Sequence, residues 1–256
     1  MKESIRRAAA LGRKISAMSI PVYAGQACFF IVLSLFPGLV LALGLLRYTP
    51  LGAADLMVLA CGFLPDALEV YAWELIRGIY AHAPGGVVPL SALTALWSAG
   101  RGIWGLGRGL NAVGGVRETG RWLRRRLICA AYTLLFLLAL VLTMAILVFG
   151  MEVGGLGREV GFLILSAGQT GLFCTMYMFL PARRSGMWES LPGAMLSSVG
   201  WMGFTALFSL YVEHFSGLAN VYGSVYAVAL GMLWLYGCIS IFFFGAALNR
   251  FLAGKM

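Results

Sequence analysis

The sequence is short of charged residues. Only 11% of its 256 residues are Asp, Glu, Lys or Arg, and 61% are hydrophobic. A soluble domain has about a quarter charged and about half apolar residues, so this scarcity excludes an ordinary soluble domain. Six stretches without a charged residue each exceed the ~18 residues that indicate a membrane-spanning helix. The composition therefore predicts an integral membrane protein.

Residues that catalyse reactions are also scarce. The two histidines, His82 and His214, are both expected near the external surface. No HExxH motif, Walker A loop or paired carboxylates occur, and "GRGIWGLGRG" (100–109) lacks the preceding strand and the spacing of a phosphate loop. The sequence thus predicts no catalytic residue and no cofactor, and we expect that the protein is not an enzyme.

The cysteines do not pair in sequence. None of the five has metal-ligand or redox-motif spacing, so we expect buried apolar residues and no metal site. They are Cys28, Cys61, Cys129, Cys174 and Cys238.

The charge-free stretches predict an all-α, polytopic membrane protein with six transmembrane helices in a single membrane domain. A short amphipathic helix is expected over 3–16. An external helical segment is expected over 47–86, where Pro65 and Asp66 begin a helix. The expected spans are residues 19–46, 87–110, 127–150, 160–181, 192–212 and 221–249.

The basic residues are sorted by side. Fourteen of the nineteen Lys and Arg lie before the first span, between the second and third, between the fourth and fifth, or after the sixth. The positive-inside rule then places both termini in the cytoplasm. We expect contacts between anionic lipid headgroups and Arg124, Arg125 and Arg126. No recognition motif indicates a nucleic-acid partner, so the expected partners are membrane lipids, and a homo-oligomer is left open.

The second span carries two arginines. The break "APGG" (83–86) starts this helix, and crossing takes ~20 residues, so the span must continue past Arg101. Arg101 and Arg108 are seven residues apart and share a face, which Asn111 extends. Because the planar guanidinium matches phosphate, this stripe predicts a site for an anionic headgroup. The alternative is that Arg101 binds backbone carbonyls or Glu189 in a packed core, while Arg108 reaches the headgroups.

Helix movement has its own candidates. Pro37 should kink the first span and free a carbonyl near Ser34. Gly105 and the other glycines around the arginines remove side-chain bulk. These positions predict a flexible or gated arrangement of helices.

Four strings are informative when taken together, namely "VLSLFPGLVLAL" (32–43), "LWSAGRGIWGLGRGLNAVGG" (96–115), "FLPARRSGMWESLPGAMLSSVGW" (179–201) and "LYVEHFSGLANVYGSVYAVALGMLWLYGCISIFFFGAALN" (210–249). With them the chain resembles the YihY/virulence factor BrkB family of bacterial inner-membrane proteins. This resemblance implies six spans in the bacterial inner membrane, and members are associated with virulence, serum resistance and envelope-lipid export. Members once carried the name ribonuclease BN, which is generally regarded as mistaken.

The resemblance departs at one position. The family pattern near the C-terminus is similar to "GAELN", and here Ala247 stands at the acidic position. The sequence as a whole favours a transporter or flippase of an anionic lipid or envelope precursor. The alternative is a non-transporting scaffold or envelope assembly factor that docks partners on 47–86, and a membrane-bound nuclease is a distant third.

Overall fold

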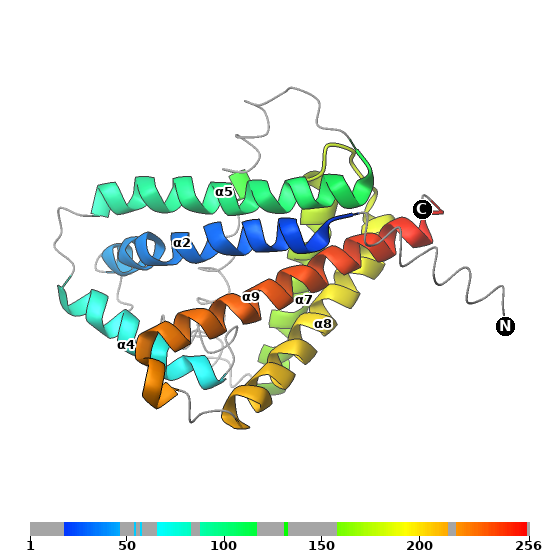
Figure 1. The fold of residues 1–256 in the computed structure, drawn as a ribbon. Helices are drawn as coiled ribbons and strands as arrows, with labels where there is room; N and C mark the ends of the chain where they lie inside the picture. The colour runs from blue at the N-terminus through cyan, green and yellow to red at the C-terminus, as the bar shows by residue number, and fades with distance from the viewer. Residues whose placement is uncertain are drawn as a thin grey trace.

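The computed structural model describes residues 18–46, 54, 57, 66–82, 88–116, 131–132, 158–214 and 219–254. Every regular element within these residues is an α-helix (Figure 1), which confirms the all-α prediction for this part of the chain. The helices are α2 (Ile20–Leu46), α4 (Asp66–His82), α5 (Val88–Gly114), α7 (Arg158–Phe179), α8 (Met187–His214) and α9 (Ala219–Leu252).

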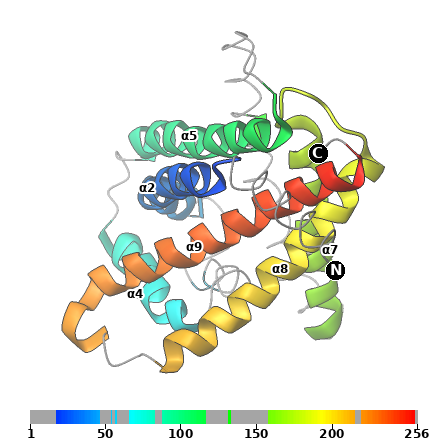
Figure 2. The ribbon, with the colours of Figure 1, turned by 45° about the vertical axis from the view of Figure 1, so that its right-hand side comes forward.

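The helices form two packed groups. In Figures 1 and 2, α5 lies antiparallel along α2, and α9 crosses on the other side of α2. The second group is formed by α8, which packs against α9, and α7, which packs against α8. The short helix α4 lies at the opposite end of the bundle from the C-terminus. The end of α5, the start of α8 and the end of α9 therefore gather at one end.

Buried side chains divide into two cores. The larger core joins α2, α5, α7, α8 and α9, and includes Leu106, Leu110 and Phe243. The smaller one joins α4 to α8 and α9 through Leu68, Phe208 and Trp234. Because α4 contributes to this second core, the amphipathic helix closes the far end of the bundle.

A polar contact ties α7 to α8 and α9 inside the larger core. The buried hydroxyl of Tyr177 donates to the carbonyl of Phe242 at 2.6 Å and lies 2.7 Å from the hydroxyl of Ser197. A buried hydroxyl without such partners would be costly. This pairing specifies one arrangement of the three helices.

Helix ends follow local chemistry. Gly115 (φ 63°) ends α5: its N–H donates to Ala112 O at 3.0 Å, and the Val116 N–H donates to Asn111 O at 2.9 Å. This pair of bonds with a left-handed glycine is the Schellman arrangement. The helix consequently runs four residues beyond the expected boundary at 110.

The other expected spans correspond to helices with small shifts. The prediction 19–46 matches α2, 160–181 matches α7, and 221–249 matches α9, each within three residues at either end. The helix α8 begins at Met187, five residues before the expected 192. The amphipathic helix over 3–16 and the span over 127–150 lie outside the described residues, apart from 131–132, which are helical.

Two of the described helices are long and apolar enough to cross a membrane, namely Met187–Glu213 within α8 and Val225–Leu252 within α9. A shorter apolar helix covers Ile20–Ser34. Only 28% of the α8 window and 33% of the α9 window are buried, whereas the core helix of a soluble protein is mostly buried. Their outward apolar surface suits lipid. The remaining spans stay predictions.

Candidate functional site

Arg101 is the central residue of α5, with thirteen helical residues on either side. At 1.5 Å per residue it lies about 20 Å from each helix end. Its side chain is exposed, and within the described part of the chain no hydrogen bond or ion pair engages it. The expected alternative partners, backbone carbonyls or Glu189, are therefore not its contacts among these residues.

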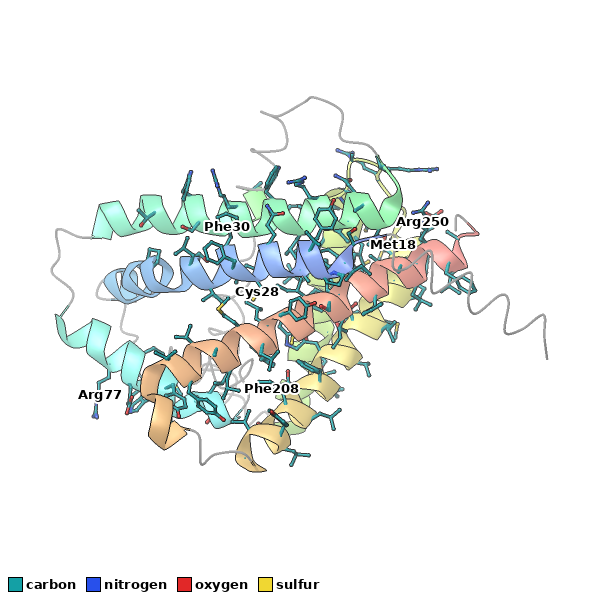
Figure 3. All side chains as sticks on the ribbon, in the orientation of Figure 1. Met18, Cys28, Phe30, Arg77, Phe208 and Arg250 are labelled. Carbon is teal, nitrogen blue, oxygen red and sulfur yellow. The ribbon has the colours of Figure 1, made fainter. Side chains whose placement is uncertain are left out.

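Aromatic rings hold the Arg101 guanidinium instead. Its central carbon lies 4.5 Å from the ring centroid of Trp97, one turn earlier in α5, and 5.4 Å from that of Phe30 in α2. Figure 3 places Phe30 between the two helices. A cation over a ring face is attracted by the ring quadrupole, so two helices together position this guanidinium.

Arg108 repeats the same arrangement. Its guanidinium carbon lies 4.8 Å from the ring centroid of Trp104 in α5 and 5.9 Å from that of Tyr23 in α2. Each step of seven residues along α5 is matched by seven residues back along α2, as antiparallel packing requires. We call the six residues Tyr23, Phe30, Trp97, Arg101, Trp104 and Arg108 the arginine–aromatic ladder.

The ladder leaves the guanidinium edge of Arg101 open to other partners among the described residues. Stacking uses the faces of the planar group, whereas its five N–H donors lie in the plane. Those donors match phosphate or carboxylate oxygens in pairs. Arg108, which has a further contact of its own, lies about 10 Å away along the axis of α5.

Two glycines of α5 lie in close contact with α2. A Cβ added at Gly105 would lie 3.3 Å from the Cα of Ala27, and one at Gly102 would lie 2.7 Å from the Cγ1 of Ile31. Small residues let helix backbones approach when lipid offers no hydrophobic drive. Gly105, a candidate for helix movement in the sequence, thus lies at a close contact between α2 and α5.

Asn111 lies on the buried side of α5, with 4% of its surface exposed. Its side-chain oxygen accepts the backbone N–H of Ala182, just after α7, at 2.7 Å. The structure thus separates Asn111 from the two arginines, and ties the end of α5 to the segment that joins α7 to α8.

The remaining expected residues are dispersed. The Ser34 hydroxyl donates to the carbonyl of Ile31 at 2.6 Å, one turn earlier in α2, and Pro37 lies within the same helix. Arg124, Arg125 and Arg126 lie outside the described residues. Ala247, at the acidic position of the family pattern, is buried in the larger core.

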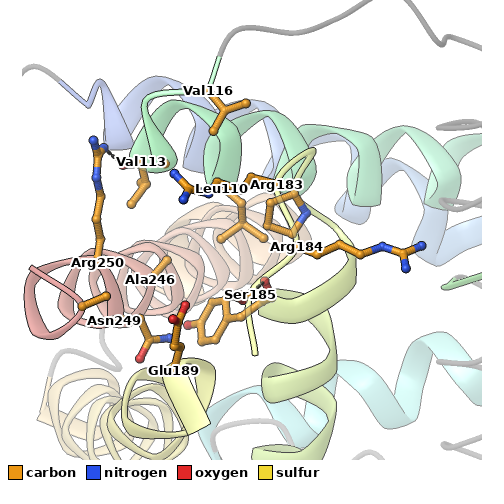
Figure 4. Close-up of a pocket in the computed structure, with 14 residues that line it drawn as sticks. Leu110, Val113, Val116, Arg183, Arg184, Ser185, Glu189, Ala246, Asn249 and Arg250 are labelled. Carbon is orange, nitrogen blue, oxygen red and sulfur yellow. Dashed lines mark hydrogen bonds between the residues drawn. The ribbon is translucent and has the colours of Figure 1, made fainter. Parts of the chain in front are cut away.

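The sequence interpretation missed a pocket at the end of the bundle. It has a volume of about 160 Å³, and among its lining residues are Arg183, Arg184 and Arg250 (Figure 4). Neither Arg101 nor Arg108 lines it. In the sequence these three arginines indicate only membrane topology. Their positions next to span ends on the same predicted side are the one signal that could have indicated a shared site.

The chain matches one protein family over almost its whole length. The family described as virulence factor BrkB matches residues 11–256. The putative ribonuclease-like protein YfkH of Bacillus subtilis (strain 168) is 27% identical over 241 residues, which cover 89% of this chain and 88% of that protein. A UPF0761 membrane protein of Pseudomonas paraeruginosa is 34% identical over 76 residues, which cover 30% of this chain and 18% of that protein. No solved structure matches the chain.

Proposed function

This chain belongs to the virulence factor BrkB family, and from that premise we propose that it moves an anionic lipid or envelope precursor between the leaflets of the bacterial inner membrane. The family match and the apolar surfaces of α8 and α9 identify a membrane protein. Transport rests on the ladder.

The observation that carries the proposal is Arg101 at the centre of α5, exposed and held over two rings. An arginine at the middle of a membrane helix costs ~2.5–3.5 kcal/mol even on the lenient insertion scale. Cation–π contacts offset part of that cost, at about 0.5–2 kcal/mol each. An arginine with this cost on an outward face indicates a function beyond stability. An anionic headgroup that passes along α5 is the partner that fits its charge.

The repeat in the ladder supports movement as well as binding. A headgroup would meet Arg108 nearer the end of α5 and Arg101 about 10 Å further along it. Its acyl chains would stay in lipid beside α2 and α5. A second guanidinium on the same path would lower the cost of each step, because the phosphate would exchange the contacts of one arginine for those of the next.

We propose that the positive-inside rule also sets the orientation of the helix bundle in the membrane. The pocket end, which holds Arg183, Arg184 and Arg250, would face the cytoplasm, and α4 would lie outside. Single cysteines at Gly254 and at Val70, in a variant lacking the native cysteines, would test this with an impermeant thiol reagent on intact spheroplasts. We expect labelling at position 70 only; labelling at position 254 only would reverse the orientation.

Close helix packing favours one alternative. The contact of Gly105 with Ala27 describes a filled interface between α2 and α5, and a rigid bundle would suit a scaffold that docks partners on α4. This alternative predicts no lipid movement.

We propose that the protein has no nuclease activity. Ribonuclease-like is a word in the name of the Bacillus subtilis relative, and it describes that protein. Among the described residues, no three His, Cys, Asp or Glu side chains group closely enough to hold a metal ion. Incubating purified protein with a labelled RNA, with and without divalent cations, tests this; protein-dependent cleavage would contradict it.

A leaflet-exchange assay in proteoliposomes tests transport. Vesicles containing a labelled phosphatidylglycerol are treated with an impermeant quencher, and the slow phase reports exchange between leaflets. We expect faster exchange with the purified full chain than in protein-free vesicles. Equal rates, repeated with a phosphatidic acid and a polyprenyl phosphate, would reject transport and favour the scaffold.

A further inference from the structure

The pocket at the end of the bundle is built from four separate segments. Its walls come from the end of α5, the α7–α8 connection, the start of α8 and the end of α9 (Figure 4). Its base is apolar, with Leu110, Val113 and Ala246. Arginines, one glutamate and two other polar side chains stand around that base: Arg183, Arg184, Arg250, Glu189, Ser185 and Asn249.

Hydrogen bonds to neighbouring protein groups fix two of the polar residues of the pocket. The Asn249 side chain accepts the N–H of Gly193 at 2.6 Å and donates to the carbonyl of Ser190 at 3.0 Å. The Ser185 hydroxyl donates to the carbonyl of Tyr177 at 3.1 Å and lies 2.7 Å from the Ser190 hydroxyl. Because the protein already uses these two side chains, the binding of a ligand depends on the charged residues of the pocket.

The three arginines differ in what they already contact. Arg250 donates to the carbonyl of Val113 at the end of α5, which fixes it in the wall of the pocket. Arg184 extends away from the other labelled residues in Figure 4, and its guanidinium carbon lies 5.9 Å from the ring centroid of Phe179. Arg183 is exposed, and no hydrogen bond or ion pair engages it within the described segments. The N–H donors of Arg183 are thus available to a ligand.

Charge and size limit what the pocket can bind. Three arginines against one glutamate favour an anion. A volume of about 160 Å³ is close to that of a cavity that accepts benzene, and lies below the ~300–1,000 Å³ of sites for whole small molecules. This volume matches a single oxyanion group.

We propose that this pocket binds one phosphate group, as the headgroup of a lipid or as a free phosphate, with Arg183 as its main ligand and Arg250 as the fixed wall. Basic pockets between helices at the membrane surface are typical sites for lipid phosphates. Arg183 makes two donors available at once to phosphate oxygens. The site is separate from the ladder, and it does not depend on transport.

Glu189 provides a test of whether the ligand of the pocket is an anion or a cation. Its carboxylate lines the same pocket and would repel a phosphate. Replacing it by Gln should strengthen phosphate binding, while a site for a cation or a basic peptide would be weakened by the same change. Arg183→Gln should act in the opposite direction to Glu189→Gln.

The experiment uses the purified full chain in neutral detergent. Inorganic phosphate is titrated at constant ionic strength and binding is followed by thermal unfolding; native mass spectrometry measures retention of added phosphatidic acid. Arg183→Gln should weaken binding about tenfold or more, the equivalent of one lost charge-assisted contact. The matched control is Arg77→Gln, which removes the same charge at the opposite end of the bundle, where Arg77 lies 5.6 Å from the Trp73 ring (Figure 3).

Each outcome decides the proposal. Binding of the lipid alone identifies a headgroup site, and binding of inorganic phosphate identifies a site open to soluble phosphate; both support the pocket if Arg183→Gln weakens them and Glu189→Gln strengthens them. No binding of either probe, equal effects of Arg183→Gln and Arg77→Gln, or weaker binding in Glu189→Gln would overturn it. Leaflet exchange is measured separately in proteoliposomes, so failure of phosphate binding here is distinct from failure of transport.

Discussion

The guanidinium carbon of Arg101 in α5 lies 5.4 Å from the centroid of the Phe30 ring in α2. Seven residues along α5, Arg108 has the same relation to Tyr23 at 5.9 Å. The ladder is therefore a property of the helix pair, because neither helix alone supplies both rings around an arginine. Substitutions in α2 should therefore alter how the arginines of α5 are positioned.

Replacing Phe30 by Leu should slow exchange of anionic lipid. The ring holds the guanidinium face, and without it the edge is no longer presented to a headgroup. We expect a fall of about two- to thirty-fold, the equivalent of the ~0.5–2 kcal/mol of a cation–π contact. Phe29→Leu is the control, because its exposed ring packs edge-on against Phe30 at 5.3 Å, while the rings that hold the two guanidinium groups in the described residues are those of the ladder. Equal exchange rates in the two variants would contradict a role of Phe30 in positioning Arg101.

Two glycines of α5 should respond oppositely to alanine. A Cβ at Gly105 would lie 3.3 Å from the backbone of Ala27, which cannot rotate away, whereas a Cβ at Gly100 would meet nothing within 4 Å. Gly105→Ala should destabilise the protein by about 1–3 kcal/mol. Gly100→Ala should be neutral or stabilise by up to ~1 kcal/mol, because alanine favours helix. Equilibrium unfolding in detergent measures both, and equal effects would contradict the packing described for α2 and α5.

Sequence patterns predicted helix positions well, and contacts poorly. Hydrophobic length located α2, α7 and α9, since an apolar run of this length can form little else in lipid. Membrane thickness placed the end of α5 at 110, but the helix continues until Gly115 closes it. A local capping signal sets this boundary, and membrane thickness carries no information about it.

The pocket was beyond sequence reasoning for a different reason. Arg183 and Arg250 are far apart in the chain, and only the packing of α9 beside α5 and α8 brings them together. Asn111 illustrates the same limit: its spacing from Arg108 suggested a shared stripe, yet its partner, Ala182, lies 71 residues away. Periodicity assigns a face to a residue; it does not say what packs against that face.

Removing the hydroxyl of Tyr177 should loosen the contact between α7 and α9. Tyr177→Phe leaves the Phe242 carbonyl and the Ser197 hydroxyl without this partner. Hydrogen bonds between membrane helices contribute on average ~0.6 and at most ~1.7 kcal/mol, so a loss in this range is expected in equilibrium unfolding. Tyr236→Phe serves as the control, because its hydroxyl makes no hydrogen bond within the described ranges. An unchanged stability in Tyr177→Phe would show that the buried pair contributes nothing.

Asn111→Ala separates positioning from direct binding. The change removes the part-buried hydrogen bond between the Ala182 N–H and the Asn111 side chain, which should cost about 0.5–1.5 kcal/mol. It should also weaken phosphate binding in the pocket, since Ala182 precedes Arg183, while leaving lipid exchange above the rate of protein-free vesicles. Unfolding, phosphate titration and exchange are measured on the same preparation. Full stability together with lost exchange would instead make Asn111 a direct headgroup ligand.

The most direct test of the central claim is leaflet exchange in Arg101→Gln, with anionic phosphatidylglycerol and zwitterionic phosphatidylethanolamine labelled in parallel vesicles. Arg77→Gln, which removes a charge at the far end of the bundle, is the matched control. If Arg101 carries the headgroup, Arg101→Gln lowers phosphatidylglycerol exchange about tenfold or more, and changes phosphatidylethanolamine exchange far less. Equal phosphatidylglycerol rates in wild type, Arg101→Gln and Arg77→Gln would contradict the claim.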